Sequence, residues 1–156
     1  MKIKLLSPNA KMPTKGSEQA AGYDLYVPKD TIINPGRNII PIDIAIALCL
    51  GYEAQIRPRS GFSAKGFEGY VLTDNGHEEI PTRFDCDVLI GTIDSDYRGN
   101  VGVIVNSHET KPFLVAAGTR IAQMVIEKHW SGELVTVNEL DNTERGEGGY
   151  NSTGTR

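Results

Sequence analysis

The sequence has only two cysteines, no long hydrophobic run and no excess of basic residues, and each lack excludes a class of protein. Cys49 and Cys86 are too far apart for a metal-binding pair and too few for a disulfide framework, which favours a reducing compartment. The longest apolar run, residues 44–50, is far shorter than the roughly 20 residues that span a bilayer. A net charge of −4 gives no sign of direct nucleic-acid binding.

What the sequence does have is the composition of a turn-rich β domain. Its 156 residues, 39% of them hydrophobic, suit one domain with a core of its own. The 17 glycines and 8 prolines favour many short strands over a helix bundle. Only residues 63–65 could begin a short helical turn. We therefore predict an all-β barrel or jelly-roll-like sandwich.

Hydrophobic periodicity supports this fold class. Apolar residues occupy every second position from Ile40 to Leu48, which is typical of a strand with one buried face. Shorter segments rich in β-branched and aromatic residues, bounded by turn residues, predict further strands at residues 23–27, 53–57, 101–105 and 121–126.

Four polar clusters interrupt these strands, and the first two each have an ordinary explanation. Residues 57–61 (Arg-Pro-Arg-Ser-Gly) could bind an anion through guanidinium, hydroxyl and backbone N–H groups, or form a simple polar turn. In residues 91–100, Asp94 and Asp96 are two positions apart and should point to opposite faces of an extended chain. One of them could activate a water molecule, or the segment could be a charged hairpin tip.

The other two clusters lie nearer the C-terminus. Strict alternation would place Arg120 and Gln123 on opposite faces of a strand, where Gln123 would need a hydrogen-bonding partner. The glycine-rich residues 145–154 combine Tyr150 with phosphate-type donors, so they could be a flexible tail or a lid over a nucleotide. They lack the Gly-Lys-Ser/Thr ending of a P-loop.

Taken together and in this order, these clusters resemble the five motifs of the homotrimeric dUTPase family. The resembling segments are residues 20–26, 57–61, 91–105, 118–123 and 145–154. The resemblance implies a distorted jelly-roll-like β-barrel in residues 1–144. It also implies a homotrimer in which a glycine-rich arm, residues 145–156, closes the active site of a neighbouring subunit.

The resemblance also implies an activity, the Mg²⁺-dependent hydrolysis of dUTP to dUMP and pyrophosphate. This reaction would keep uracil out of DNA and supply dUMP for thymidylate synthesis. Asp94 corresponds to the residue that orients and deprotonates the water attacking the α-phosphorus. Mg²⁺ would be held mainly by the substrate phosphates and waters, with Asp24 as a candidate outer-shell group or as the partner of an arginine.

The remaining correspondences concern substrate binding. Tyr97 would pack against the deoxyribose and Tyr150 would stack on uracil, while the second and fifth motifs would hold the phosphates. The full set of residues expected to bind substrate is Arg59, Ser60, Gly61, Gly91, Thr92, Ile93, Tyr97, Gly102, Gln123, Arg145, Tyr150, Asn151, Ser152 and Thr153.

The stretch between the second and third motifs departs from the family pattern, because it is longer than in the short family members. The extra residues fall at about 69–87, where Asn75-Gly76 predicts an additional hairpin. This insertion could be a tolerated surface feature, could modify the uracil end of the site, or could bind a protein partner.

Two alternative functions on the same fold stay open. One is a dCTP deaminase-like enzyme, although the fifth motif and residues 93–97 follow the dUTPase pattern. The other is a nucleotide-gated regulatory protein that uses the insertion as its contact surface. We expect a cytoplasmic protein, from a bacterial cell or a phage-infected host, with a eukaryotic origin left open.

Overall fold

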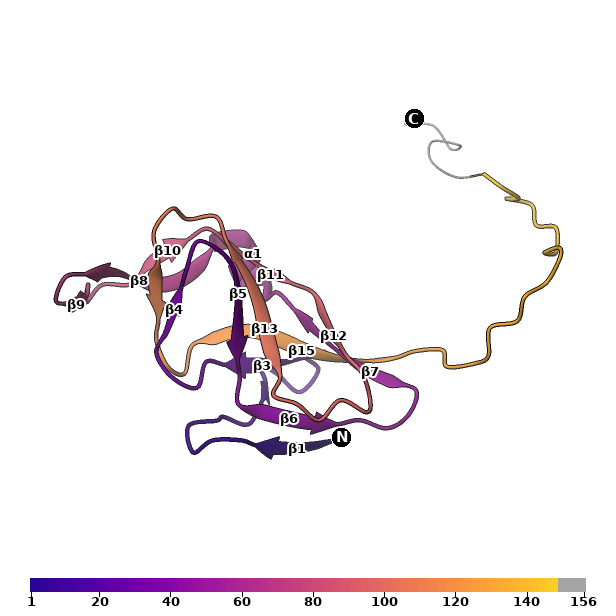
Figure 1. Ribbon diagram of the computed structural model, residues 1–156, viewed down its shortest axis with the longest axis horizontal. Helices are drawn as coiled ribbons and strands as arrows, with labels where there is room; N and C mark the ends of the chain where they lie inside the picture. Colours follow the sequence, from indigo (N-terminus) through magenta and orange to yellow (C-terminus); the bar gives the residue numbers. More distant parts are fainter. Residues whose placement is uncertain (149–156) are drawn as a thin grey trace.

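The computed structural model describes residues 1–148, and most of its regular structure is β-strand (Figure 1). The one helix of this part of the chain is α1 (Ser60–Lys65). The strands are β1 (Lys2–Leu5), β2 (Thr14–Lys15), β3 (Gly22–Tyr26), β4 (Thr31–Ile33), β5 (Gly36–Pro41), β6 (Ile44–Ala47), β7 (Tyr52–Arg57), β8 (Phe67–Thr73), β9 (Gly76–His77), β10 (Thr82–Phe84), β11 (Cys86–Leu89), β12 (Gly91–Ile93), β13 (Gly102–Ser107), β14 (Phe113–Val115) and β15 (Arg120–Lys128).

These strands form four curled sheets around one core, a distorted jelly-roll-like barrel as predicted. The sheet orders are β12-β7-β15-β3-β2, β10-β8-β14-β4 with β9 on β8, β11-β13-β5, and β1-β6. The largest fully buried side chains come from all four sheets: Phe67, Phe113, Leu25, Ile33, Ile40, Ile42, Ile44, Ile46, Ile56, Ile121, Met124 and Val27. The predicted strands at residues 23–27, 53–57, 101–105 and 121–126 are confirmed as β3, β7, β13 and β15.

The predicted single strand from Ile40 to Leu48 is wrong, and its alternating burial holds only from Ile40 to Ile44, because Ala45 is also buried. Ile42 and Ile44 are fully buried, yet β5 ends at Pro41 and β6 begins at Ile44. Between them Asp43 has a φ of 58°, a left-handed conformation that Asp tolerates better than most residues. The chain turns a corner here and passes from the β11-β13-β5 sheet to the β1-β6 sheet.

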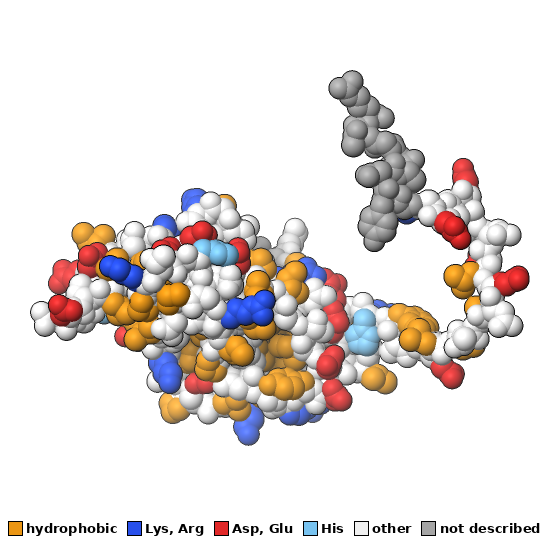
Figure 2. Space-filling view, turned by 45° about the horizontal axis from the view of Figure 1, so that its top comes forward, with side chains coloured by type: hydrophobic (Ala, Val, Ile, Leu, Met, Phe, Trp, Pro, Cys, Tyr) orange, Lys and Arg blue, Asp and Glu red, His pale blue; other side chains and the backbone are white. Residues whose placement is uncertain are grey.

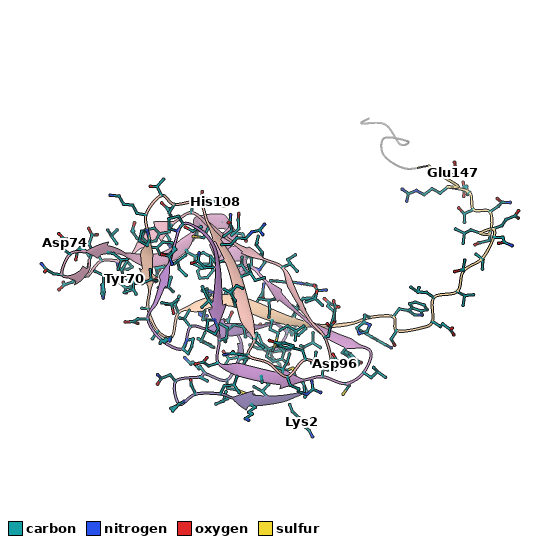
Figure 3. The ribbon with its side chains drawn as sticks, viewed as in Figure 1. Lys2, Tyr70, Asp74, Asp96, His108 and Glu147 are labelled. Carbon is teal, nitrogen blue, oxygen red and sulfur yellow. The ribbon has the colours of Figure 1, made fainter. Side chains whose placement is uncertain are left out.

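The insertion at residues 69–87 forms the hairpin predicted from Asn75-Gly76. Thr73 pairs with Gly76 across a two-residue turn, so β8 and β9 project from the barrel. Asp74 lies at the tip of this projection (Figure 3). The ends of the insertion belong to the barrel itself, because the Phe84 ring stacks on Phe113 at a centroid distance of 3.9 Å.

Beyond β15 the chain leaves the barrel. Residues 129–147 are exposed and form no helix or strand, and they extend far from the sheets (Figure 1). The departure therefore begins well before residue 145, where composition placed the start of the arm. Five large apolar side chains on this extension are solvent-exposed, as Figure 2 partly shows: Trp130, Leu134, Val135, Val137 and Leu140.

No helix in residues 1–148 has the length and apolar character needed to cross a membrane.

Candidate active site

Residues of the first, second and fourth motifs line one small cavity, which we call the arginine cavity. Its volume is about 200 Å³. The predicted residues Asp24, Arg59, Ser60, Gly61 and Gln123 all contribute to it. The other lining residues are Gly16, Ala20, Gly22 and Arg120.

A buried carboxylate organises the arginine cavity. Asp24, on β3, accepts hydrogen bonds from Arg59 Nε at 2.8 Å and from Arg120 Nη1 at 3.3 Å. The Asp24 side chain is only 12% exposed, so this pairing offsets the cost of burying its charge. Both carboxylate oxygens are engaged, while each guanidinium keeps free N–H donors for an anion.

A β-bulge explains how Arg120 and Gln123 come to share this cavity. Strand β15 pairs with β3, but the register shifts between Arg120 and Ala122, so one residue is extra. Arg120 then lies opposite Tyr26 and Gln123 opposite Asp24, which places both on the same face. The prediction that they face opposite sides is therefore wrong, because strict alternation does not hold across a bulge.

The Gln123 side chain closes the floor of the arginine cavity. Its Nε2 donates to the carbonyl oxygen of Pro58 at 2.9 Å, so β15 is joined to the turn that leads into α1. A Cβ on Gly22, on the neighbouring strand β3, would lie 2.2 Å from Gln123 Oε1, so a larger residue there would force the Gln123 side chain to shift. The Pro58 carbonyl is thus the hydrogen-bonding partner that Gln123 was expected to need.

Residues of the third motif line a second cavity of about 210 Å³, which we call the tyrosine cavity. It contains six of the predicted residues: Gly91, Thr92, Ile93, Asp94, Tyr97 and Gly102. Ile56, Asn100, Val101 and Ile104 complete it. Asp94 lines this cavity and is exposed, whereas Asp96 does not line it. This agrees with the expectation that the two acids point in different directions.

Local contacts hold the Tyr97 ring at this cavity. The Tyr97 hydroxyl donates to the Asn100 carbonyl at 3.2 Å, and Asn100 Nδ2 donates to Asp43 Oδ1 at 2.9 Å. A Cβ on Gly99 would lie 2.3 Å from the Tyr97 hydroxyl oxygen, so the ring needs a glycine at this position. The corner residue Asp43 thus connects the turn between β5 and β6 to the third motif.

The predicted residues of the fifth motif are not brought to either cavity within this chain. Arg145 lies on the extension, where its Nε donates to the Gly148 carbonyl at 2.8 Å. Tyr150, Asn151, Ser152 and Thr153 lie outside the described residues. Sequence reasoning left Arg120 and Asn100 out of the site, although Arg120 belongs to the fourth cluster.

The arginine cavity and the tyrosine cavity share no lining residue. Asp24 is on β3 and Thr92 on β12, and β15 and β7 lie between these strands. Three strand spacings separate the two, roughly 14 Å. A single chain therefore presents two separate cavities, one with arginine donors suited to an anion and one lined mostly by apolar side chains and glycines.

Within residues 1–148, no three His, Cys, Asp or Glu side chains are grouped so as to hold a metal ion. The two groups with a shifted pKa, Cys86 and His108, line neither cavity. Burial raises the pKa of the Cys86 thiol, and a hydrogen bond from His108 Nε2 to Asp87 Oδ2 at 2.7 Å raises the pKa of His108. The expectation that both thiols are buried is confirmed for Cys86 and wrong for Cys49, which is exposed.

The fold and the two cavities define an all-β, jelly-roll-like protein with two separate candidate binding cavities. The family model for dUTPase matches residues 8–79 and 85–154, and this chain belongs to the dUTPase family.

Known proteins resemble the chain over nearly its whole length. A deoxyuridine 5′-triphosphate nucleotidohydrolase of Syntrophotalea carbinolica is 41% identical, over 99% of this chain and 96% of that protein. The enzyme of the same name from Oryza sativa is also 41% identical, over 99% of this chain and 80% of that protein. The structure of Staphylococcus bacteriophage 80alpha dUTPase with dUpNHpp has a TM-score of 0.80 and 29% identity, covering 98% of this chain and 97% of that one.

Proposed function

We propose that this protein hydrolyses dUTP to dUMP and pyrophosphate. The observation that carries the proposal is the pair of complementary cavities, which contain the predicted residues of four of the five motifs. The named activity of relatives 41% identical over almost the full chain supports it. The product dUMP would then serve thymidylate synthesis, and removal of dUTP would keep uracil out of DNA.

The active form is a homotrimer in which one subunit's tyrosine cavity meets a neighbour's arginine cavity. The two cavities do not share residues within one chain, so a nucleoside and its phosphates need both partners. The exposed apolar side chains of the extension support association, because such a row needs a covering surface. The residues beyond 148 would close the site.

In this arrangement each cavity has its own task. The tyrosine cavity holds the nucleoside, with the Tyr97 ring against the deoxyribose, where a 2′-hydroxyl would not fit. Asp94, exposed at the rim, accepts a proton from the attacking water. The free N–H donors of Arg59 and Arg120, with Ser60 and Gly61, bind the phosphates and stabilise the charge that develops on them.

Mg²⁺ would be held mainly by the phosphates and waters. The described residues fit this arrangement, because they provide no three-ligand cluster and Asp24 already pairs with two arginines. Asp24 would then act only from the outer shell, as the group that fixes Arg59 and Arg120. Bound to the triphosphate, the ion would neutralise its charge.

The test is pyrophosphate release from dUTP, dCTP, dTTP and UTP by the wild type and by Asp94→Asn, with Mg²⁺ and with a chelator. We expect release from dUTP alone, lost with the chelator and reduced about 10²- to 10⁴-fold in Asp94→Asn, the usual contribution of a general base. Asp96→Asn is the matched control, because Asp96 is exposed on the same loop and lines neither cavity.

Other outcomes would replace the proposal. Ammonia release from dCTP would establish the deaminase-like alternative. A trimer that binds dUTP without releasing pyrophosphate would favour the regulatory alternative.

A further inference from the structure

The insertion contributes to a third cavity, which we call the helix cavity, beside α1. Strand β10 carries Arg83, and its partner strand β8 follows α1 directly. The helix ends at Gly66, where a Cβ would lie 2.5 Å from the Phe84 carbonyl oxygen, so β10 comes very close to the helix end. Arg83 Nη1 donates to the Gly66 carbonyl at 3.3 Å. The insertion thus delivers a guanidinium group to the end of α1.

The helix cavity is strongly cationic. Its volume is about 400 Å³, and four of its lining side chains are basic. The lining residues are Arg59, Gly61, Phe62, Lys65, Glu68, Arg83, Gly118, Thr119 and Arg120. Glu68, the single acidic residue among them, pairs with Arg83 at 3.0 Å, and Asp24 pairs with Arg59 and Arg120. Four basic groups therefore face two carboxylates, which leaves an excess of positive charge at the cavity. Such a cavity concentrates anions.

This cavity adjoins the arginine cavity. Arg59, Gly61 and Arg120 line both, so an anion at the Ser60-Gly61 turn can extend past the two arginines toward Lys65 and Arg83. The floor is rigid, because the Arg59 guanidinium lies over the Phe62 ring and that ring stacks on Phe67 at 4.4 Å. The insertion therefore lies at the phosphate side of the site. None of its residues lines the tyrosine cavity.

We infer that the helix cavity is a polyphosphate subsite, in which Arg83 and Lys65 bind the terminal phosphates of the substrate and the pyrophosphate product. The inference rests on the proposed function. It goes beyond the family pattern, since the family model leaves out residues 80–84, where Arg83 lies. The insertion thereby becomes a part of the binding site.

The test is binding of inorganic pyrophosphate with Mg²⁺, measured by calorimetry on the full chain. We expect Arg83→Gln and Lys65→Gln each to raise the pyrophosphate Kd about two- to fivefold, as the loss of one exposed charge pair does. The double variant should raise the pyrophosphate Kd about tenfold. Arg83→Lys should restore most of the affinity, and Lys111→Gln, an exposed charge far along the chain, should match the wild type.

A second ligand separates direct binding from a general disturbance. Affinity for dUMP should not change in the Arg83 and Lys65 variants, because dUMP lacks the terminal phosphates. In dUTP hydrolysis KM should rise while kcat stays constant, the pattern of a uniform binding contact.

Three results would overturn the inference. One is an unchanged pyrophosphate Kd in the double variant, and another is an equal loss of dUMP and pyrophosphate affinity. The third is a weakened trimer with unchanged pyrophosphate affinity, which would assign the cavity to the acidic residues 139–147 of a neighbouring copy. Because pyrophosphate binding is measured without turnover, a wild type that binds it but does not hydrolyse dUTP would refute only the proposed function.

Discussion

At the scale of single residues, glycines next to site side chains determine where those side chains can lie. Gly22 leaves room for the amide of Gln123, and Gly99 leaves room for the Tyr97 ring. Neither glycine has a positive φ, so their importance comes from close approach and not from backbone conformation. The geometry of the candidate site thus depends on absent side chains as well as on present ones.

The substitution Gly99→Ala should therefore disturb the sugar contact without removing any functional group. Its Cβ would lie within 2.5 Å of two Tyr97 atoms, so the ring must move. We expect the ratio of kcat/KM for dUTP over UTP to fall about tenfold, since a misfit of one small group is worth roughly 1–3 kcal/mol. Ser95→Ala, in the same loop, is the control. An unchanged ratio in a folded Gly99→Ala protein would show that the ring does not discriminate sugars.

At the scale of elements, the insertion has two parts with different roles. Its tip, the turn at Asp74, projects from the barrel, and in Figure 3 it lies at the opposite end of the barrel from Asp96. Its base is part of the β10-β8-β14-β4 sheet, where Phe84 stacks on Phe113 and a Cβ on Gly69 would lie 2.7 Å from the Leu114 carbonyl oxygen. Length alone does not distinguish a projecting tip from a structural base.

Shortening the tip should accordingly be tolerated. Replacing residues 72–79 with Asn-Gly keeps Val71 paired with Phe113 and keeps Arg83 on β10. We expect unchanged denaturation midpoints and an unchanged preference for dUTP over dTTP and dCTP. Phe84→Ala is the contrast, with a loss of up to about 3 kcal/mol in the free energy of unfolding, measured in urea. A changed base preference in the shortened protein would show instead that the insertion acts at the uracil end of the site.

At the scale of the whole molecule, the central feature is that one chain carries two separate cavities and an extension that leaves its own barrel. The extension exposes apolar side chains that include Trp130, which is 70% exposed, and Leu140, which is 85% exposed. A neighbouring copy can cover these side chains and complete the site at once, which is why closed symmetry suits this chain.

Mixing two inactive variants tests the shared site. Asp94→Asn impairs the tyrosine cavity and Arg59→Ala the arginine cavity, and each alone should be inactive. When the two variants are refolded together in equal amounts, the mixture should recover about a quarter of the wild-type rate. In randomly mixed cyclic trimers, about a quarter of the sites join an intact tyrosine cavity to an intact arginine cavity. Sites built within one chain would recover nothing. Light scattering should give a mass of three chains of 17.0 kDa each.

The sequence by itself determined the fold class, and it predicted most of the residues that line the two cavities. Alternating hydrophobicity is a local property, so it located β3, β7, β13 and β15, and it showed which side of residues 40–44 is buried. The order of the motifs led to Asp94, Tyr97 and the Arg59-Ser60-Gly61 turn. Residues beyond 148, including Tyr150, keep the roles that the resemblance implies as predictions.

Only the tertiary structure decided which of these residues meet. The bulge in β15 brings Arg120 and Gln123 to the face of Asp24, and the corner at Asp43 divides one alternating segment between two sheets. The pairing of β10 with β8 places Arg83 beside α1. Register and barrel closure depend on contacts between segments far apart in the chain, and a period of two residues contains no information about them.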